Sequence, residues 1–217
     1  MKDIKKIVKL DLSQQLIDNL IHAGYPFAAW KMPFSSEVQL IISLSGSSKI
    51  SDFSIAESKA GFVINAYASN HPVHPYFIPA DLVITKEAVR INPQVKDLNI
   101  DTLLESLSQS NNKSGKKLKK SRTHAADVFE VNVERAVDRI RKQHFHKVVL
   151  SRYKDEYLPQ QFESWHFFEK ICSAYPSAFC NLYFIPEKGL WIGATPEILI
   201  SDNDKRFLTV ALAGTKS

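Results

Sequence analysis

The chain of 217 residues has 28 Lys and Arg and 23 Asp and Glu, which gives a formal net charge of +5. Its 44% hydrophobic, 11% aromatic and 24% charged residues exclude a disordered or fibrous protein and indicate an ordinary globular fold. The net charge is no evidence for a nucleic-acid or membrane partner, because six basic residues and no acidic ones lie between Lys113 and Arg122. Without those six, the chain has 22 basic and 23 acidic residues and is close to neutral.

Hydropathy and cysteine usage indicate the compartment. No apolar run of about 18 residues is present, so we expect no membrane-spanning helix. The first 15 residues mix charges with apolar side chains and lack the apolar stretch of a signal peptide. Cys172 and Cys180 have no metal-ligand spacing, which predicts reduced, buried thiols. Together these patterns predict a cytoplasmic protein.

The first half of the chain predicts one helix followed by strands. Ser13 is a good N-cap for a helix over 14–21, and Gly24 is a good terminator. Two β-prone runs follow, at 27–34 and 38–44, with Pro33 in the connection. The other elements expected here are strands over 61–68 and 81–85, a proline-containing loop over 70–76 and a helix over 101–108.

The second half predicts a more regular pattern. Residues 108–122 are rich in Ser, Asn and Lys and predict a mobile, solvated loop. A helix facing a core is then predicted by apolar residues at helical spacing: Phe129, Val133, Ala136, Val137 and Ile140. The elements expected after it are a strand over 147–153, a helix over 162–174, a hairpin of 178–185 and 190–194, and a second hairpin of 197–201 and 206–213. This order predicts an α+β fold with antiparallel sheets.

Lys147 is the first candidate for chemistry. It opens the apolar run Lys147-Val-Val-Leu-Ser-Arg152. A lysine at this position points either to solvent at a sheet edge or into a cleft, and the pattern alone favours solvent. In a cleft, desolvation would lower its pKa from about 10.4 toward that of a useful general base.

Two further segments could contact a ligand. Gly193-Ala-Thr-Pro-Glu197 forms a stiff turn that presents one carboxylate, either as an exposed hairpin residue or as a general acid whose pKa an apolar pocket raises. In Leu212-Ala-Gly214-Thr215, the glycine allows close approach of the backbone, and the hydroxyl can bind an oxyanion. The histidines at 71, 74, 144 and 146 lack a third ligand with recognisable spacing, so we predict no metal site there.

The segments KVVLSR, YPSAFCNLYFIPEKGLWIGATPEILI and LTVALAGTKS, in this order, resemble the chorismate-utilising enzymes. That family includes isochorismate synthase, salicylate synthase and the first components of anthranilate synthase and aminodeoxychorismate synthase. The resemblance covers roughly 129–217 and, more loosely, 27–85. It implies a four-layer α/β/β/α fold like that of anthranilate synthase, with antiparallel sheets packed face to face and helices outside. It also implies a variable N-terminal part over 1–112, a basic mobile loop over 113–122 and the first part of the chorismate-binding region over 123–217.

The resemblance also implies a reaction. Family members that add water to chorismate have lysine at the start of the VVLSR run, whereas members that add ammonia usually have glutamine. Lys147 would therefore be the base that activates water for attack at C2, and Glu197 the acid that protonates the departing C4 hydroxyl. Gly214 and Thr215 would contact a substrate carboxylate. We expect an isochorismate synthase, with salicylate synthase as the nearest alternative.

Family enzymes are much longer than this chain. The glutamates that hold their Mg²⁺ correspond to positions beyond Ser217, so we expect a fragment that binds the metal only with the missing part and has little turnover alone. Chorismate is the expected partner, with no nucleic acid and no membrane. A non-catalytic half-fold binding module is the alternative from another class, and a nucleic-acid arm at 113–122 is a fourth hypothesis. Isochorismate feeds menaquinone and catechol siderophores, and the sequence selects neither.

Overall fold

The computed structural model describes two compact units. The described residues are 12–49, 59–65, 74–95, 102–103, 106–107, 126–152, 154, 156–159, 161–198, 200–202 and 206–209. The first unit comprises Met1–Asn112 and Glu163–Val210, and the second comprises Lys113–Phe162 and Ala211–Ser217. The expected basic loop at 113–122 lies outside the described residues.

The first unit begins with α1 (Gln14–Ala23), which confirms the helix expected there. The Ser13 hydroxyl accepts a hydrogen bond from the Leu16 N–H at 3.3 Å and so satisfies one free donor of the first turn. The helix ends at Gly24, whose φ of 75° is a left-handed conformation that glycine adopts without a Cβ clash. Both helix ends are therefore encoded locally.

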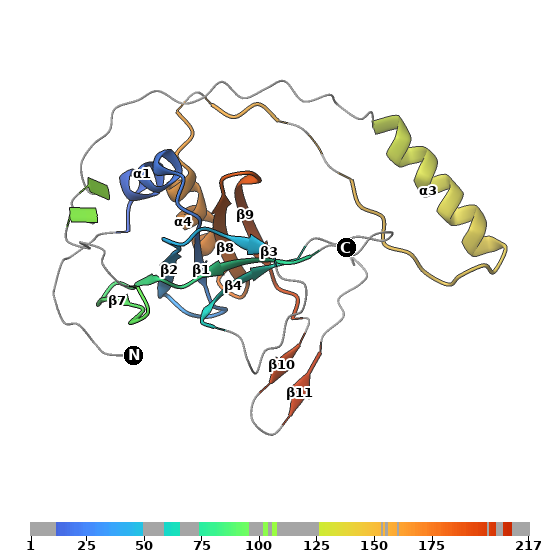
Figure 1. The fold of residues 1–217 in the computed structure, drawn as a ribbon. Helices are drawn as coiled ribbons and strands as arrows, with labels where there is room; N and C mark the ends of the chain where they lie inside the picture. The colour runs from blue at the N-terminus through green and yellow to red at the C-terminus, as the bar shows by residue number, and fades with distance from the viewer. Residues whose placement is uncertain are drawn as a thin grey trace. The chain divides into compact units, whose positions relative to one another are not determined.

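The centre of this unit is a six-stranded sheet in the order β7-β6-β2-β1-β8-β9 (Figure 1). Every neighbouring pair is antiparallel, as expected. The strands are β1 (Phe27–Lys31), β2 (Val38–Ile42), β6 (Leu82–Ile84), β7 (Val89–Ile91), β8 (Phe179–Ile185) and β9 (Gly189–Thr195). Pairing of β1 with β8 joins the two parts of the sequence that make up this unit.

One face of the large sheet packs against α1 and α4 (Ser164–Ala174). Alternate residues of each strand point to this face, because successive side chains of a strand lie on opposite sides of the sheet. The buried cluster between the helices and the sheet contains Leu16, Ile17, Leu20, Phe27, Ala29, Leu40, Ile42, Leu82, Ile84, Leu107, Trp165, Phe168, Ala178, Cys180, Leu182 and Phe184.

The two helices are also joined by a side-chain cap. Glu163, the N-cap residue of α4, makes no capping hydrogen bond with its own side chain. Instead, Gln14 of α1 accepts a hydrogen bond from the Trp165 N–H at 2.7 Å, while its amide donates to Asp18 at 2.7 Å. A donor at the start of α4 is thus satisfied by a residue from the beginning of the chain.

The opposite face of the large sheet packs against a three-stranded antiparallel sheet in the order β3-β5-β4. Its strands are β3 (Ser48–Lys49), β4 (Gly61–Ile64) and β5 (Tyr76–Pro79). Ala28, Ile41 and Ile185 from the large sheet meet Ile78 here, and the rings of Trp30 and Phe62 have their centroids 5.7 Å apart. The first unit therefore has helix, sheet and sheet layers, which confirms the α+β class. The four-layer arrangement stays a prediction.

Two predicted boundaries in the first unit, one of a strand and one of a loop, need correction. The strand expected over 27–34 stops at Lys31, because Pro33 lacks an N–H and Phe34 has a φ of 59° in a turn closed by the Ser35 N–H and the Met32 carbonyl at 3.1 Å. The loop expected over 70–76 ends one residue early, since β5 begins at Tyr76. At Gly61, a Cβ would collide with the Phe77 ring and the Ile78 carbonyl, so the small sheet requires glycine there.

Asp81, just before β6, is hydrogen-bonded to the loop that follows β2. Its buried carboxylate accepts hydrogen bonds from the backbone N–H groups of Leu44 at 2.8 Å and Ser45 at 3.0 Å. The Ser45 hydroxyl donates to the same oxygen at 2.9 Å. Because these donors replace water, the carboxylate is buried without losing its hydrogen bonds.

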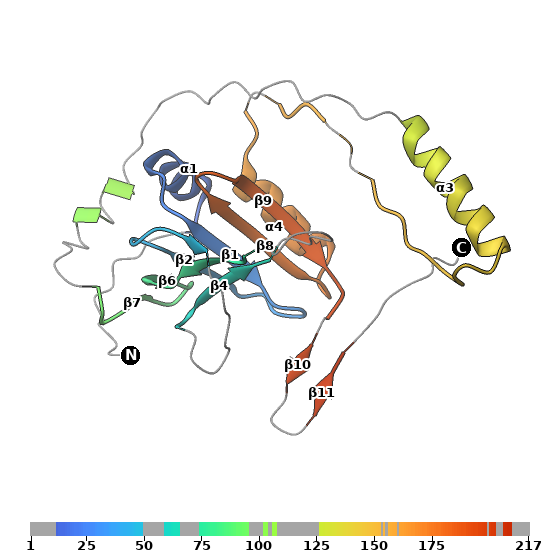
Figure 2. The ribbon, with the colours of Figure 1, turned by 45° about the vertical axis from the view of Figure 1, so that its right-hand side comes forward.

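The C-terminal part of the first unit confirms the expected hairpin of β8 and β9, which Figure 2 shows as one long twisted pair. The register pairs Phe179 with Thr195 and Ile185 with Gly189, whose φ of 82° closes the turn. The second expected hairpin is present but short, formed by β10 (Ser201–Asp202) and β11 (Phe207–Leu208).

The second unit contains α3 (Ala126–Arg141), which confirms the helix expected there. The prediction that this helix faces a core is wrong for the described residues: Val133, Val137 and Ile140 are exposed, and only Phe129 and Ala136 of the apolar set are half-buried. The strand expected over 147–153 is also wrong for its described part, 147–152, which pairs with no other described segment. An isolated strand does not persist without a partner to take its hydrogen bonds.

We predict that Phe168→Ala in α4 lowers the free energy of unfolding by about 3–5 kcal/mol, because the ring is fully buried in the helix-facing core and its removal leaves a cavity. Phe167→Ala is the matched control: this ring is 44% exposed, and its loss should cost about 1 kcal/mol or less. Urea denaturation followed by circular dichroism measures both. Equal losses in the two variants would contradict the packing of α4.

Candidate functional site

Lys147 lies in the second unit, shortly after α3. The helix ends in a turn where Gln143 has a φ of 58° and its N–H donates to the Ile140 carbonyl at 2.9 Å. The next N–H, that of His144, donates to the Arg139 carbonyl at 3.0 Å. These bonds satisfy free carbonyls of the last helical turns and form the turn that ends the helix. The Lys147 side chain that follows is exposed.

Glu197 lies in the first unit, two residues after the end of β9. Its N–H donates to the Thr195 hydroxyl at 3.1 Å, a local turn that fixes the backbone at the point where the carboxylate leaves the sheet. Its side chain is exposed. Two residues before Thr195, Gly193 faces Asn181 of β8, and a Cβ at this position would lie 3.3 Å from the Asn181 amide. The GATPE segment is therefore positioned by the sheet.

The structure describes two of the four predicted site residues. Lys147 and Glu197 belong to different units, so the structure describes the surroundings of each but no common site. Gly214 and Thr215 lie outside the described residues. The roles of all four therefore stay predictions.

No metal site is formed by the described residues. Among them, no group of three or more His, Cys, Asp and Glu side chains is placed to hold an ion. Mg²⁺ prefers six oxygen ligands, several of them carboxylates or water, and the described part of the chain provides no such set. The described residues thus do not fit the expected Mg²⁺, and its ligands stay a prediction.

Comparison with known proteins identifies the family. The model of a family described as "Chorismate binding enzyme" matches residues 46–217. The chain belongs to the chorismate-binding enzyme family. The matched region includes Lys147, Glu197, Gly214 and Thr215, so all four candidate residues lie within the family domain. No curated protein and no solved structure matches the chain.

Membership of the chorismate-binding family implies an enzyme that acts on chorismate and makes chorismate the small-molecule partner. The family match does not distinguish isochorismate synthase from salicylate synthase or from other members. In the described part of this chorismate-binding protein, no helix is long and apolar enough to cross a membrane.

Sequence reasoning missed a buried polar cluster in this chorismate-binding protein. Lys31 of β1 is only 4% exposed and lies directly across from Cys180 of β8. Its ammonium group donates to the backbone carbonyls of Pro176 at 3.2 Å and Met32 at 3.3 Å. The sequence does carry a signal for this burial. Phe27, Ala29 and Lys31 are alternate residues of one strand, so the lysine lies on the same core-facing side as the two apolar residues.

Cys172 of α4 is a further titratable member of this cluster, beside Lys31 and Cys180. Burial, and then the neighbouring Cys180, raise the pKa of the Cys172 thiol to about 12. Both cysteines are free thiols, and Cys180 is fully buried. Since the thiolate is the nucleophile, a thiol with so high a pKa is inert at neutral pH. This fits a packing role for the two cysteines.

We predict that iodoacetamide labels Cys172 in the folded protein at pH 8 at least about a hundredfold more slowly than in urea. The raised pKa keeps nearly all of the thiol protonated at pH 8, so the labelling rate of the folded protein should rise about tenfold per pH unit above pH 8. Mass spectrometry of the peptide measures the labelling. An equal rate in folded and unfolded protein would show that α4 does not shield this thiol.

Proposed function

We propose that this protein is an isochorismate synthase, which isomerises chorismate to isochorismate. The observation that carries the proposal is Lys147 at the start of the VVLSR run, within a chain of the chorismate-binding enzyme family. The order of the lysine segment, the GATPE segment and the AGT segment supports the same assignment. A salicylate synthase, which also removes pyruvate, is the nearest alternative in the same family.

In the proposed reaction, Lys147 takes a proton from water as the water oxygen bonds to C2 of the substrate ring. The two ring double bonds shift, and the bond between C4 and its hydroxyl oxygen breaks. Glu197 gives its proton to that oxygen, which leaves as water. One water enters and one departs, so substrate and product are isomers. The two residues fit these roles, because water is a poor nucleophile unless deprotonated and hydroxide a poor leaving group unless protonated.

The proposal places a requirement on the surroundings of both side chains. The base must be neutral and the acid protonated at the start of the reaction, and exclusion of water favours both of these uncharged forms. In the structure, Lys147 and Glu197 are exposed. We therefore propose that the active protein encloses the two side chains around the substrate, with Gly214 and Thr215 contacting a substrate carboxylate.

Mg²⁺ is also part of the proposal. Chorismate carries two carboxylates, and a bound divalent cation would neutralise one of them. No step is assigned to the ion, because the described residues hold no ligand set for it.

Product analysis tests the proposed function. The protein expressed from its complete reading frame is incubated with chorismate, with Mg²⁺ or with EDTA, and the products are separated by liquid chromatography. We expect isochorismate with Mg²⁺ and little conversion with EDTA. Salicylate and pyruvate without isochorismate would instead identify a salicylate synthase. Binding of chorismate without any conversion would favour a non-catalytic module.

We predict that Lys147→Ala and Glu197→Gln each lower kcat by roughly 10²–10⁴-fold, the usual contribution of a positioned base or acid. Chorismate binding, measured by calorimetry, should remain detectable in both variants. Lys170→Ala and Glu169→Gln are the matched controls, because both residues are exposed on α4 and neither lies in a motif segment. Near-normal kcat in either site variant would refute the role assigned to that residue.

A further inference from the structure

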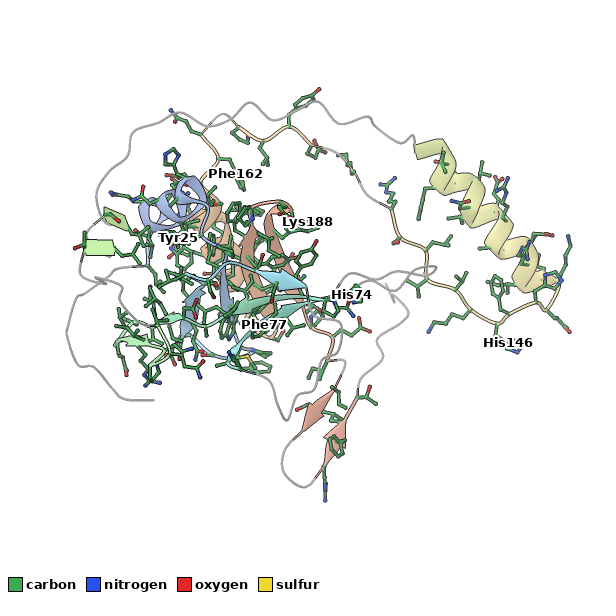
Figure 3. The ribbon with its side chains drawn as sticks, viewed as in Figure 1. Tyr25, His74, Phe77, His146, Phe162 and Lys188 are labelled. Atoms are coloured by element: carbon green, nitrogen blue, oxygen red, sulfur yellow. The ribbon has the colours of Figure 1, made fainter. Side chains whose placement is uncertain are left out.

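The chain that carries Lys147 is attached to α3 at the C-terminal end of the helix. Hydrogen bonds from Gln143 and His144 to carbonyls of the last helical turns fix the turn that precedes Lys147. Figure 3 labels His146 in this stretch, next to the end of the helix. The turn is reinforced by Lys142, whose ammonium group donates to Asp138 at 2.7 Å and holds the pKa of that carboxyl below its usual value.

A second attachment lies at the other end of the same stretch. The Arg152 guanidinium carbon is 5.5 Å from the centroid of the Phe129 ring, near the start of α3. This separation falls within the roughly 6 Å at which a cation is attracted to the face of an aromatic ring. Phe129 is half-buried, so part of its ring is kept from water. Both residues belong to the second unit.

The two attachments together confine the residues between them. The eight residue-to-residue steps from His144 to Arg152 can extend as far as about 28 Å. The helix between Phe129 and Arg139 rises only about 15 Å. With the turn alone, residues 147–152 could leave the helix in many directions. With Arg152 also held on Phe129, the segment must return along α3, and Lys147 is restricted with it.

We infer that Phe129 and Arg152 are positioning residues for Lys147. This inference rests on the proposed function, because it concerns the delivery of the proposed base. Neither residue need touch chorismate: the contact limits where the Lys147 backbone can lie, and so keeps its amine at the distance from the attacking water that proton transfer requires.

Kinetics of matched variants test this role. Phe129→Leu keeps an apolar side chain of similar size but removes the ring, and Arg152→Leu removes the cation. Each should lower kcat roughly tenfold, with KM and the urea midpoint little changed. Phe129→Tyr keeps the ring and should retain activity. Arg135→Leu, an exposed arginine in the middle of α3, is the control and should have no effect. The double variant should be no worse than either single one, because both remove the same contact.

An NMR measurement tests the contact between Arg152 and Phe129 without depending on turnover. Placed over the Phe129 ring, the Arg152 side-chain protons should show a ring-current shift in NMR spectra of arginine-labelled protein, and Phe129→Leu should abolish that shift. Absence of the shift in the wild type would overturn the inference. If the wild type makes isochorismate but the variants keep full kcat, the positioning role fails and the proposed function stands. A wild type that leaves chorismate unchanged would overturn both.

Discussion

The backbone pairing of β1 with β8 is the interaction on which the first unit depends. It connects strands from distant parts of the chain and places both at the centre of the six-stranded sheet. On one side of this pair, β2 brings in the N-terminal strands; on the other, β9 leads to the GATPE segment. Each face of the pair also contributes side chains to a buried hydrophobic cluster. One cluster lies against the helices and the other against the small sheet. Loss of this pairing would separate Glu197 from the core that positions it.

Much of the local structure could be predicted from the sequence. Ser13 and Gly24 define the two ends of α1 through a hydroxyl cap and a left-handed glycine. The hairpin of β8 and β9 follows from two apolar runs around a short turn. These features depend on neighbours in the chain, so their signals lie in adjacent residues. The partner of β1, in contrast, could not be predicted, because pairing between distant strands depends on how the whole core is filled.

The wrong predictions have the same cause. Residues 147–152 have the composition of a strand, but a strand needs a second segment to take its hydrogen bonds. Val133, Val137 and Ile140 form an apolar stripe, but a stripe alone does not provide the surface that covers it. For the candidate site, the residue types at Lys147 and Glu197 follow from motif and resemblance. Their mutual geometry does not follow, because the two residues are far apart in the sequence and belong to different units.

We propose that this member of the chorismate-binding enzyme family adds water to its substrate by means of Lys147 and Glu197. The origin of the hydroxyl oxygen in the product distinguishes addition of water from retention of the substrate's own oxygen. The protein from the complete reading frame is incubated with chorismate in water enriched in ¹⁸O, and the product is analysed by mass spectrometry. We expect isochorismate with one ¹⁸O atom, attached at C2. Isochorismate without the label would contradict it, since the C4 oxygen would then have been retained.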